Sequence, residues 1–346
     1  MKNYAEDTTL SRLTDVNVVG LTGMSQVKKV NEANIDMNVL NRDMTNKSFK
    51  NFCDAFTHRE DTLIMVNQLN QLIKCVQKHR GLSMTMLGVG GGEFKTDFLQ
   101  LQSQLERRLA TMEIFAKKMN GVLSERDKEN LHLAWETIRK DWQDDNLNDN
   151  FELHSHFVQQ LLAMVSGLAK QLEAPLIDFT NVAETFIPES ERDQPQMFKQ
   201  MEILNFVAKQ LPALIECLAK VRGLASYAAA MGSASELDSR KLRYLIASTR
   251  EEKLRIIAQA ERLESFLLQD MPSLRTIKNI ELKHIFLLNV VETDVLSGSV
   301  IVADAHQLFG LCTEIIDAYW AIVDDGLEVV RRWHSEDLDV WCKLGC

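Results

Sequence analysis

The sequence predicts an all-α protein made of two tandem, duplicated four-helix bundles packed along their lengths. The chain has 346 residues but only 5 prolines, none of them before Pro175, and scarce proline favours long helices. Apolar residues recur at three- and four-residue steps, which is the period of an amphipathic helix. Hydrophobic residues make up 45% of the chain, enough for a sizeable core. A sequence pattern that occurs twice predicts the duplication.

The repeated pattern covers residues 69–82 and 211–224. The two segments align without a gap, and both read L-x-x-L-I-x-C-x-x-K-x-R-G-L. Eight of the fourteen positions are therefore identical, whereas average residue usage would give about one. An internal repeat of this kind indicates two similar structural units.

The domain boundaries follow from shifts in composition. A polar and weakly patterned arm precedes the first bundle, and a stretch with three prolines and several charged residues separates the two units. We expect an N-terminal arm over 1–55, a first bundle over 56–175, a linker over 176–196, a second bundle over 197–335 and a short tail over 336–346.

The helices of the first unit are predicted over residues 58–87, 95–120, 124–142 and 151–172. The glycine-rich run 88–92 stops the first of them. It is not followed by the Gly-Lys-Ser/Thr of a phosphate-binding loop, so we interpret it as a turn. Ser124 and Asp127 have the spacing of a capping box at the start of the third helix.

The second unit follows the same plan. Its helices are predicted over residues 197–231 and 236–269, from Pro272 onwards, and over 300–333. Pro212 lies within the first of these and should kink it or mark a restart, because proline lacks an amide N–H. Gly232 and Ser233 mark the turn before the second helix.

Arg80 and Arg222 occupy equivalent positions in the repeat, and both fall on the apolar stripe of their helix. A buried guanidinium without a partner is costly because the charge loses its hydration. Each arginine therefore needs a carboxylate, backbone carbonyls, water or an anionic ligand. Gly81 and Gly223 follow them, and a glycine lets another backbone or a small ligand come close.

Other function classes find little support in the sequence. The net charge of -10 argues against a general nucleic-acid binder, and no apolar run is long enough for a membrane span. The N-terminus lacks the apolar run of a signal peptide, so we expect a cytoplasmic protein. The six cysteines form no C-x-x-C pair, and His154 and His156 are two residues apart and do not share a helix face. The sequence shows neither a nucleophile with a neighbouring base nor a cluster of metal ligands, so nothing in it indicates an enzyme.

Residues 78–83 (Lys-His-Arg-Gly-Leu-Ser) and 220–225 (Lys-Val-Arg-Gly-Leu-Ala) resemble the arginine-glycine-leucine signature of the NIT domain. This domain is the nitrate- and nitrite-sensing module of bacterial signalling proteins, and the resemblance extends over roughly residues 58–335. It implies two stacked four-helix bundles with one nitrate or nitrite held between Arg80 and Arg222, without catalysis, metal or cofactor. The residues that would shape the pocket are Gly81, Leu82, Ser83, Gly223, Leu224 and Ala225.

The resemblance also bears on partners. Members of the family usually carry an effector on the same chain, whereas about a dozen residues follow Trp333 here. We therefore expect a separate effector or regulator protein, no direct nucleic-acid binding and no membrane, and a homodimer is compatible with the long amphipathic helices. The alternative is a helical interaction or scaffold protein that keeps this fold with structural arginines and no ligand. In that case each arginine should pair with a fixed carboxylate.

Overall fold

The computed structural model describes residues 32–89, 94–119, 121–140, 142–173, 196–267, 269–298 and 300–344. These residues form helices and turns and no strand, which confirms the all-α prediction for this part of the chain. The chain divides into two compact units, Met1–Asn51 and Phe52–Cys346. The expected arm up to residue 31 and nearly all of the expected linker lie outside the described residues.

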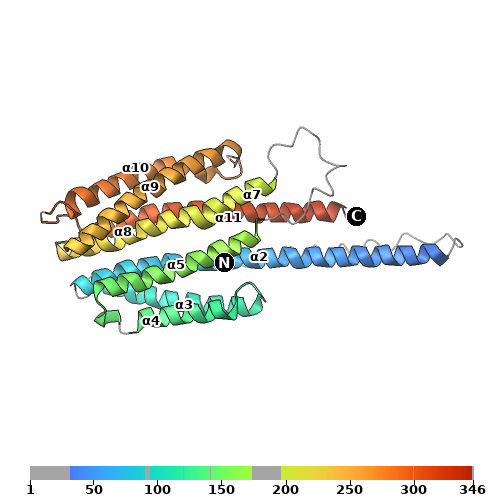
Figure 1. The fold of residues 1–346 in the computed structure, drawn as a ribbon, viewed down its shortest axis with the longest axis horizontal. Coiled ribbons are helices and arrows are strands. Elements are labelled where there is room, and N and C mark those ends of the chain that lie inside the picture. Colours follow the sequence, from blue (N-terminus) through green and yellow to red (C-terminus); the bar gives the residue numbers. More distant parts are fainter. Residues whose placement is uncertain are drawn as a thin grey trace. The chain divides into compact units, whose positions relative to one another are not determined.

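The long helices are labelled in Figure 1. They are α2 (Glu32–Val89), α3 (Lys95–Lys118), α4 (Glu125–Arg139), α5 (Leu147–Gln171), α7 (Gln196–Asn205), α8 (Leu211–Met231), α9 (Glu236–Leu267), α10 (Thr276–Val290) and α11 (Ala305–Leu344). Short 3-10 turns, η3 (Trp142–Asp144) and η6 (Pro272–Arg275), and π turns, η5 (Phe206–Gln210) and η7 (Val291–Val295), complete the described elements.

Helix α2 begins at Glu32, so the prediction of a first helix starting near His58 was wrong. Residues 32–80 contain neither glycine nor proline, and nothing in this stretch breaks a helix. The apolar stripe that led to the prediction is buried from Leu63 onwards. The stripe thus lies in the second half of a helix whose first residue is Glu32.

The expected start of α4 is confirmed. The Ser124 side chain accepts a hydrogen bond from the Asp127 amide at 3.1 Å, and the Ser124 amide donates to the Asp127 carboxylate at 3.3 Å. This reciprocal pair satisfies two amides that the helix itself leaves without acceptors. At the end of α8, Gly232 adopts a left-handed conformation with a φ of 67°, which glycine adopts without steric strain.

Pro212 lies in the first turn of α8, directly after the π turn Phe206–Gln210. The Leu211 amide donates to the carbonyl of Phe206, five residues earlier, so the backbone is widened just before the proline. Proline fits the first turn of a helix because its missing N–H would have no partner there. The backbone remains helical through Gln210 and Leu211, so the structure shows a π turn before Pro212 and no break in the helix.

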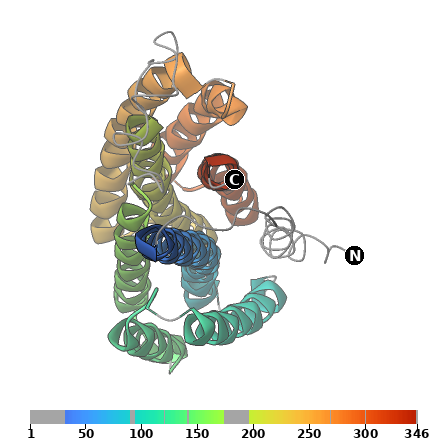
Figure 2. The same cartoon turned by 90° about the vertical axis from the view of Figure 1, so that its right-hand side faces the viewer.

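Within residues 52–346, α2 and α8 run in the same direction, and α5 and α11 run in the opposite direction (Figure 1). Helix α8 packs against α9 and α11, while α5 contacts both α8 and the π turn before it. Figure 2 views these helices nearly end-on, with α3 and α4 on one side and α9 and α10 on the opposite side. The buried apolar side chains of both halves belong to one hydrophobic cluster. The α2–α8 contact thus lies inside the core.

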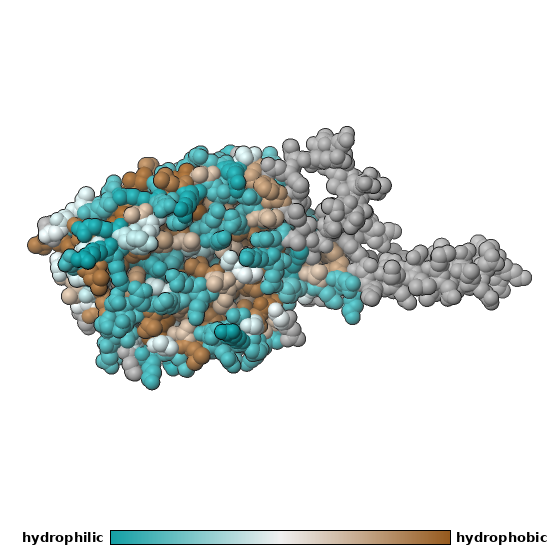
Figure 3. Space-filling view, in the orientation of Figure 1, coloured by the Kyte–Doolittle hydropathy of each residue, from teal (hydrophilic) through white to brown (hydrophobic). Residues whose placement is uncertain are grey.

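The face drawn in Figure 3 is mainly hydrophilic, with hydrophobic residues scattered across it. Among the described residues, no helix combines the length and the apolar character that crossing a membrane requires.

Candidate functional site

Helices α2 and α8 approach each other closely at the two glycines of the repeat. A Cβ atom on Gly223 would lie 3.8 Å from the Cα atom of Gly81 and 3.0 Å from the sulfur of Met84. A Cβ atom on Gly81 would lie 2.7 Å from the Phe309 ring and 3.7 Å from Nε of Arg222. The space beside the glycines is therefore filled by the facing helix and by Phe309. This close approach places Arg222 of one helix next to Gly81 of the other.

Arg80 is fully buried and paired with a carboxylate. Its Nη1 and Nη2 atoms donate to the two oxygens of Glu216 at 2.7 and 3.1 Å. Nη1 also donates to Oγ of Ser155 at 3.0 Å, and the guanidinium lies 5.5 Å from the Phe151 ring centre. Gln77 donates a further hydrogen bond to Glu216 at 2.9 Å. A carboxylate that fills the fork of the guanidinium neutralises the charge of Arg80.

Arg222 is only 2% exposed but has different electrostatic surroundings. Its Nη1 atom donates to the Thr313 hydroxyl at 2.9 Å, and its guanidinium lies 4.7 Å from the centre of the Phe309 ring. Among the described residues, no carboxylate comes within ion-pair distance of Arg222, and its Nε atom has no hydrogen-bond partner. Burial lowers the pKa of Arg222 to about 10, because the charged form loses its hydration. This guanidinium is therefore a buried cation without a contacting anion.

Each arginine contacts an aromatic ring and a hydroxyl group on another helix, and the two helices share the same short sequence pattern there. Residues 151–155 of α5 read Phe-Glu-Leu-His-Ser, and residues 309–313 of α11 read Phe-Gly-Leu-Cys-Thr. The aromatic and hydroxyl side chains are four residues apart and share a helix face. Both hydroxyls also donate to the carbonyl four residues earlier, each at 2.7 Å. The sequence prediction did not include these aromatic and hydroxyl residues, although the shared F-x-L-x-S/T pattern could have revealed them.

The other predicted site residues are also buried at this contact. Oγ of Ser83 lies 3.0 Å from the Arg80 carbonyl oxygen and 2.7 Å from Oδ1 of Asn150, so its single proton is shared between these two acceptors. Leu82, Leu224 and Ala225 belong to the hydrophobic core. The prediction that both arginines point into the core is confirmed by their burial. The structure brings Arg222 and Gly223 next to Gly81, while Leu82 and Leu224 serve as packing residues.

Two histidines next to Arg80 form a buried pair. Nδ1 of His79 lies 2.7 Å from Nε2 of His154, and Nδ1 of His154 lies 2.7 Å from the Asn150 carbonyl. Burial holds both pKa values well below the usual range, that of His154 at about 3, so both rings are neutral. Because Nδ1 of His154 donates to the Asn150 carbonyl, Nε2 of His154 carries no proton and accepts a hydrogen bond from Nδ1–H of His79. No group of three or more potential metal ligands occurs in the described part of the chain.

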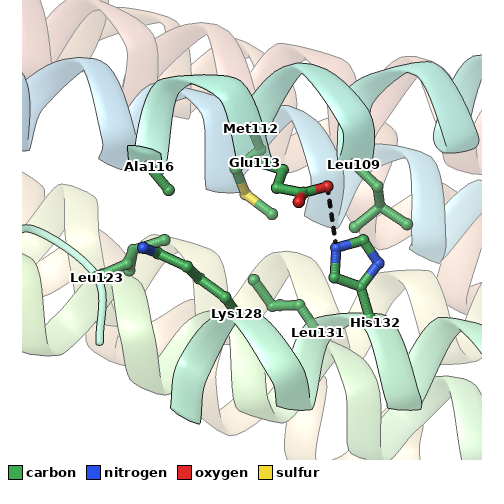
Figure 4. A pocket seen from close by; sticks show the side chains of 8 residues that line it. All are labelled: Leu109, Met112, Glu113, Ala116, Leu123, Lys128, Leu131 and His132. Carbon is green, nitrogen blue, oxygen red and sulfur yellow. Dashed lines mark ion pairs between the residues drawn. The ribbon is translucent and has the colours of Figure 1, made fainter. Parts of the chain in front are cut away.

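A surface pocket between α3 and α4 makes a weaker candidate (Figure 4). Its walls are mostly apolar, and Glu113 and His132 face each other across it at 3.4 Å. The imidazole is half exposed and the carboxylate is partly exposed, so water competes for each of them. The buried arginines therefore remain the candidate site. Comparison of this chain with protein-family models, curated proteins and solved structures finds no match.

Proposed function

We propose that this chain is a nitrate- or nitrite-binding sensor of bacterial signal transduction, with its ligand site where α2 meets α8 at Arg80 and Arg222. The observation that carries the proposal is the state of Arg222, a buried cation that contacts a hydroxyl and an aromatic ring but, within the described part of the chain, no carboxylate. An anion bound there would restore the electrostatic stabilisation that the guanidinium loses on burial.

Nitrate and nitrite suit this position chemically. Both are small, planar and singly charged, and the guanidinium presents planar donors that match two oxygens at once. Arg222 keeps its Nε donor free of protein partners among the described residues. The neighbouring residue on α2 is Gly81, and the Phe309 ring and Nε of Arg222 lie against it. The ligand would then lie between two helices from different halves of the chain.

The proposal includes two duplicated four-helix bundles, one containing α2 to α5 and the other α8 to α11. Two features support this organisation: both halves contain the arginine-glycine segment, and in both the arginine contacts an aromatic and a hydroxyl residue of the F-x-L-x-S/T pattern. A ligand between the halves can bias their relative arrangement, to the extent that it binds one arrangement more tightly than the other. A micromolar ligand provides about -8 kcal/mol in total. We propose that a separate effector or regulator protein in the cytoplasm detects the change.

One observation favours a second function. The Arg80–Glu216 pair is the arrangement expected of a helical interaction or scaffold protein whose arginines are structural. Such a protein would keep the fold and bind no anion. Arg222 distinguishes the two functions, since a purely structural arginine should also have a carboxylate partner.

Isothermal titration of nitrate and nitrite into the purified chain, in chloride-free buffer, tests the proposal. The sensor predicts saturable binding of one anion per chain, lost in Arg222→Gln. Binding should persist in Arg255→Gln, which removes a largely exposed arginine of α9. Circular dichroism establishes that each variant is folded. Absence of binding in the wild-type protein would favour the scaffold.

A further inference from the structure

Position six of the repeat carries opposite charges in its two copies. It is Glu216 in α8 and Lys74 in α2, between the same Leu-Ile and Cys residues. Glu216 lies across the helix contact from Arg80 and forms the buried ion pair. Because α2 and α8 run in the same direction, the equivalent of this pair would join position 74 to Arg222. A lysine at position 74 cannot provide the carboxylate.

The Lys74 side chain makes contacts on α11 instead. Its ammonium pairs with Asp324 at 3.0 Å and lies 5.1 Å from the Trp320 ring centre. Its side chain is 23% exposed, so water reaches part of it. The difference at one repeat position thus explains why Arg80 pairs with a carboxylate across the helix contact, whereas Arg222 has no such partner among the residues that the structure describes.

We infer that Glu216 acts as an internal anion on Arg80 and thereby restricts the ligand to one negative charge, held by Arg222. This inference rests on the proposed anion-binding function. A carboxylate resembles nitrite and nitrate in presenting two coplanar oxygens, and Glu216 occupies the Arg80 fork with both of its oxygens. Arg80 is therefore a positioning residue that acts through Glu216, and Arg222 contacts the ligand.

The charge count at the site determines which anion fits. Arg80 and Glu216 cancel each other, and Arg222 contributes one positive charge. Lys220 lies 3.7 Å from Glu216 but reaches solvent, and Asp317 influences Arg222 from beyond ion-pair distance. A monovalent anion neutralises Arg222, whereas a divalent anion leaves an excess negative charge in the core. Uncompensated buried charge is strongly disfavoured, so sulfate should be excluded.

Titration of nitrate and of sulfate into the full chain and three variants tests this inference. Glu216→Gln frees Arg80, so nitrate should bind about tenfold or more tightly and sulfate binding should appear. Lys74→Glu introduces a carboxylate opposite Arg222 and should weaken nitrate binding about tenfold or more. Lys74→Gln is the matched control, because it also removes the ion pair with Asp324 but adds no carboxylate. It should bind nitrate as the wild type does.

The outcomes separate this inference from the proposed function. If the wild type binds nitrate but Glu216→Gln binds it no better and gains no sulfate binding, the inference fails and the sensor function stands. If neither the wild type nor any variant binds an anion, the sensor function fails. Should Glu216→Gln not fold, Lys74→Glu and Lys74→Gln decide the matter. Equal nitrate affinity in these two variants would overturn the inference, and loss only in Lys74→Glu supports it.

Discussion

The buried Arg80–Glu216 pair makes a prediction about stability that does not depend on any ligand. The side chains of Arg80 and Glu216 are 0% and 6% exposed, so replacing Glu216 with glutamine leaves an unmatched charge in the core. Removing one partner of a buried ion pair costs about 3–5 kcal/mol. A chain of 346 residues has an unfolding entropy of about 0.7 kcal/mol per degree, so the loss corresponds to a Tm lower by about 4–7 °C.

The assay is thermal unfolding followed by circular dichroism, with a surface ion pair as the control. Arg250 and Glu292 form the same two-oxygen fork at 2.7 and 2.5 Å, but their side chains are 46% and 38% exposed. Glu292→Gln should cost no more than about 1 kcal/mol, because water screens an exposed pair. Equal Tm shifts in Glu216→Gln and Glu292→Gln would refute the reasoning.

A double variant refines the test. Arg80→Met and Glu216→Leu together replace both charges with apolar side chains, so no buried charge remains unmatched. The double variant should therefore lose less stability than the sum of the two single variants, with a coupling of about 1–3 kcal/mol. Additive losses would mean that the two side chains do not interact in the folded protein.

Three further predictions concern a glycine, a histidine and a cysteine. Gly81→Ala places a methyl group 2.7 Å from the Phe309 ring and should lose about 1–3 kcal/mol in urea unfolding, whereas Gly167→Ala meets open space and should gain up to about 1 kcal/mol. Burial lowers the pKa of His154 to about 3, so the unfolded chain binds a proton first as the pH falls. Its contribution to stability should therefore decrease by about 1.4 kcal/mol per pH unit from about pH 6.5 towards about 3, and urea midpoints of His154→Gln should depend less on pH than those of the wild type. Burial raises the pKa of Cys312 to about 12, so mass spectrometry should find the Cys312 peptide unlabelled by a thiol reagent at pH 8 until the chain is unfolded, and rapid labelling in the native state would contradict this.

The burial of both arginines could be predicted from the sequence, but their partners could not. The three- and four-residue steps of the apolar stripe define one face of a helix, and Arg80 and Arg222 lie on that face whatever the helix packs against. Which carboxylate meets Arg80 depends on how α2 and α8 are rotated about their axes. Glu216 lies in a polar position of the repeat pattern, and no local signal identifies it as the partner of a residue 136 positions away.

The need for space at Gly81 and Gly223 could also be predicted from the sequence, but for a different reason. A helical glycine reduces helix stability, so its presence at the same repeat position twice indicates a need for space. The structure shows which atoms use that space, namely the facing backbone at Gly223 and the Phe309 ring at Gly81. The start of α2 could not be predicted in this way. Residues 32–57 have no regular apolar stripe, and their sequence resembles that of a polar loop.

The opposite charges at positions 74 and 216 also have a consequence for symmetry. Two identical subunits that met through such a segment would present the same residue on both sides of their two-fold axis. With glutamate at the sixth repeat position of both subunits, each arginine would have a carboxylate partner. With lysine there in both, neither arginine would have one. A single polypeptide that contains both segments can vary them separately. If the proposed anion site exists, joining the halves in one chain permits a stoichiometry of one anion for two arginines, which a symmetric pair of half-length chains could not encode.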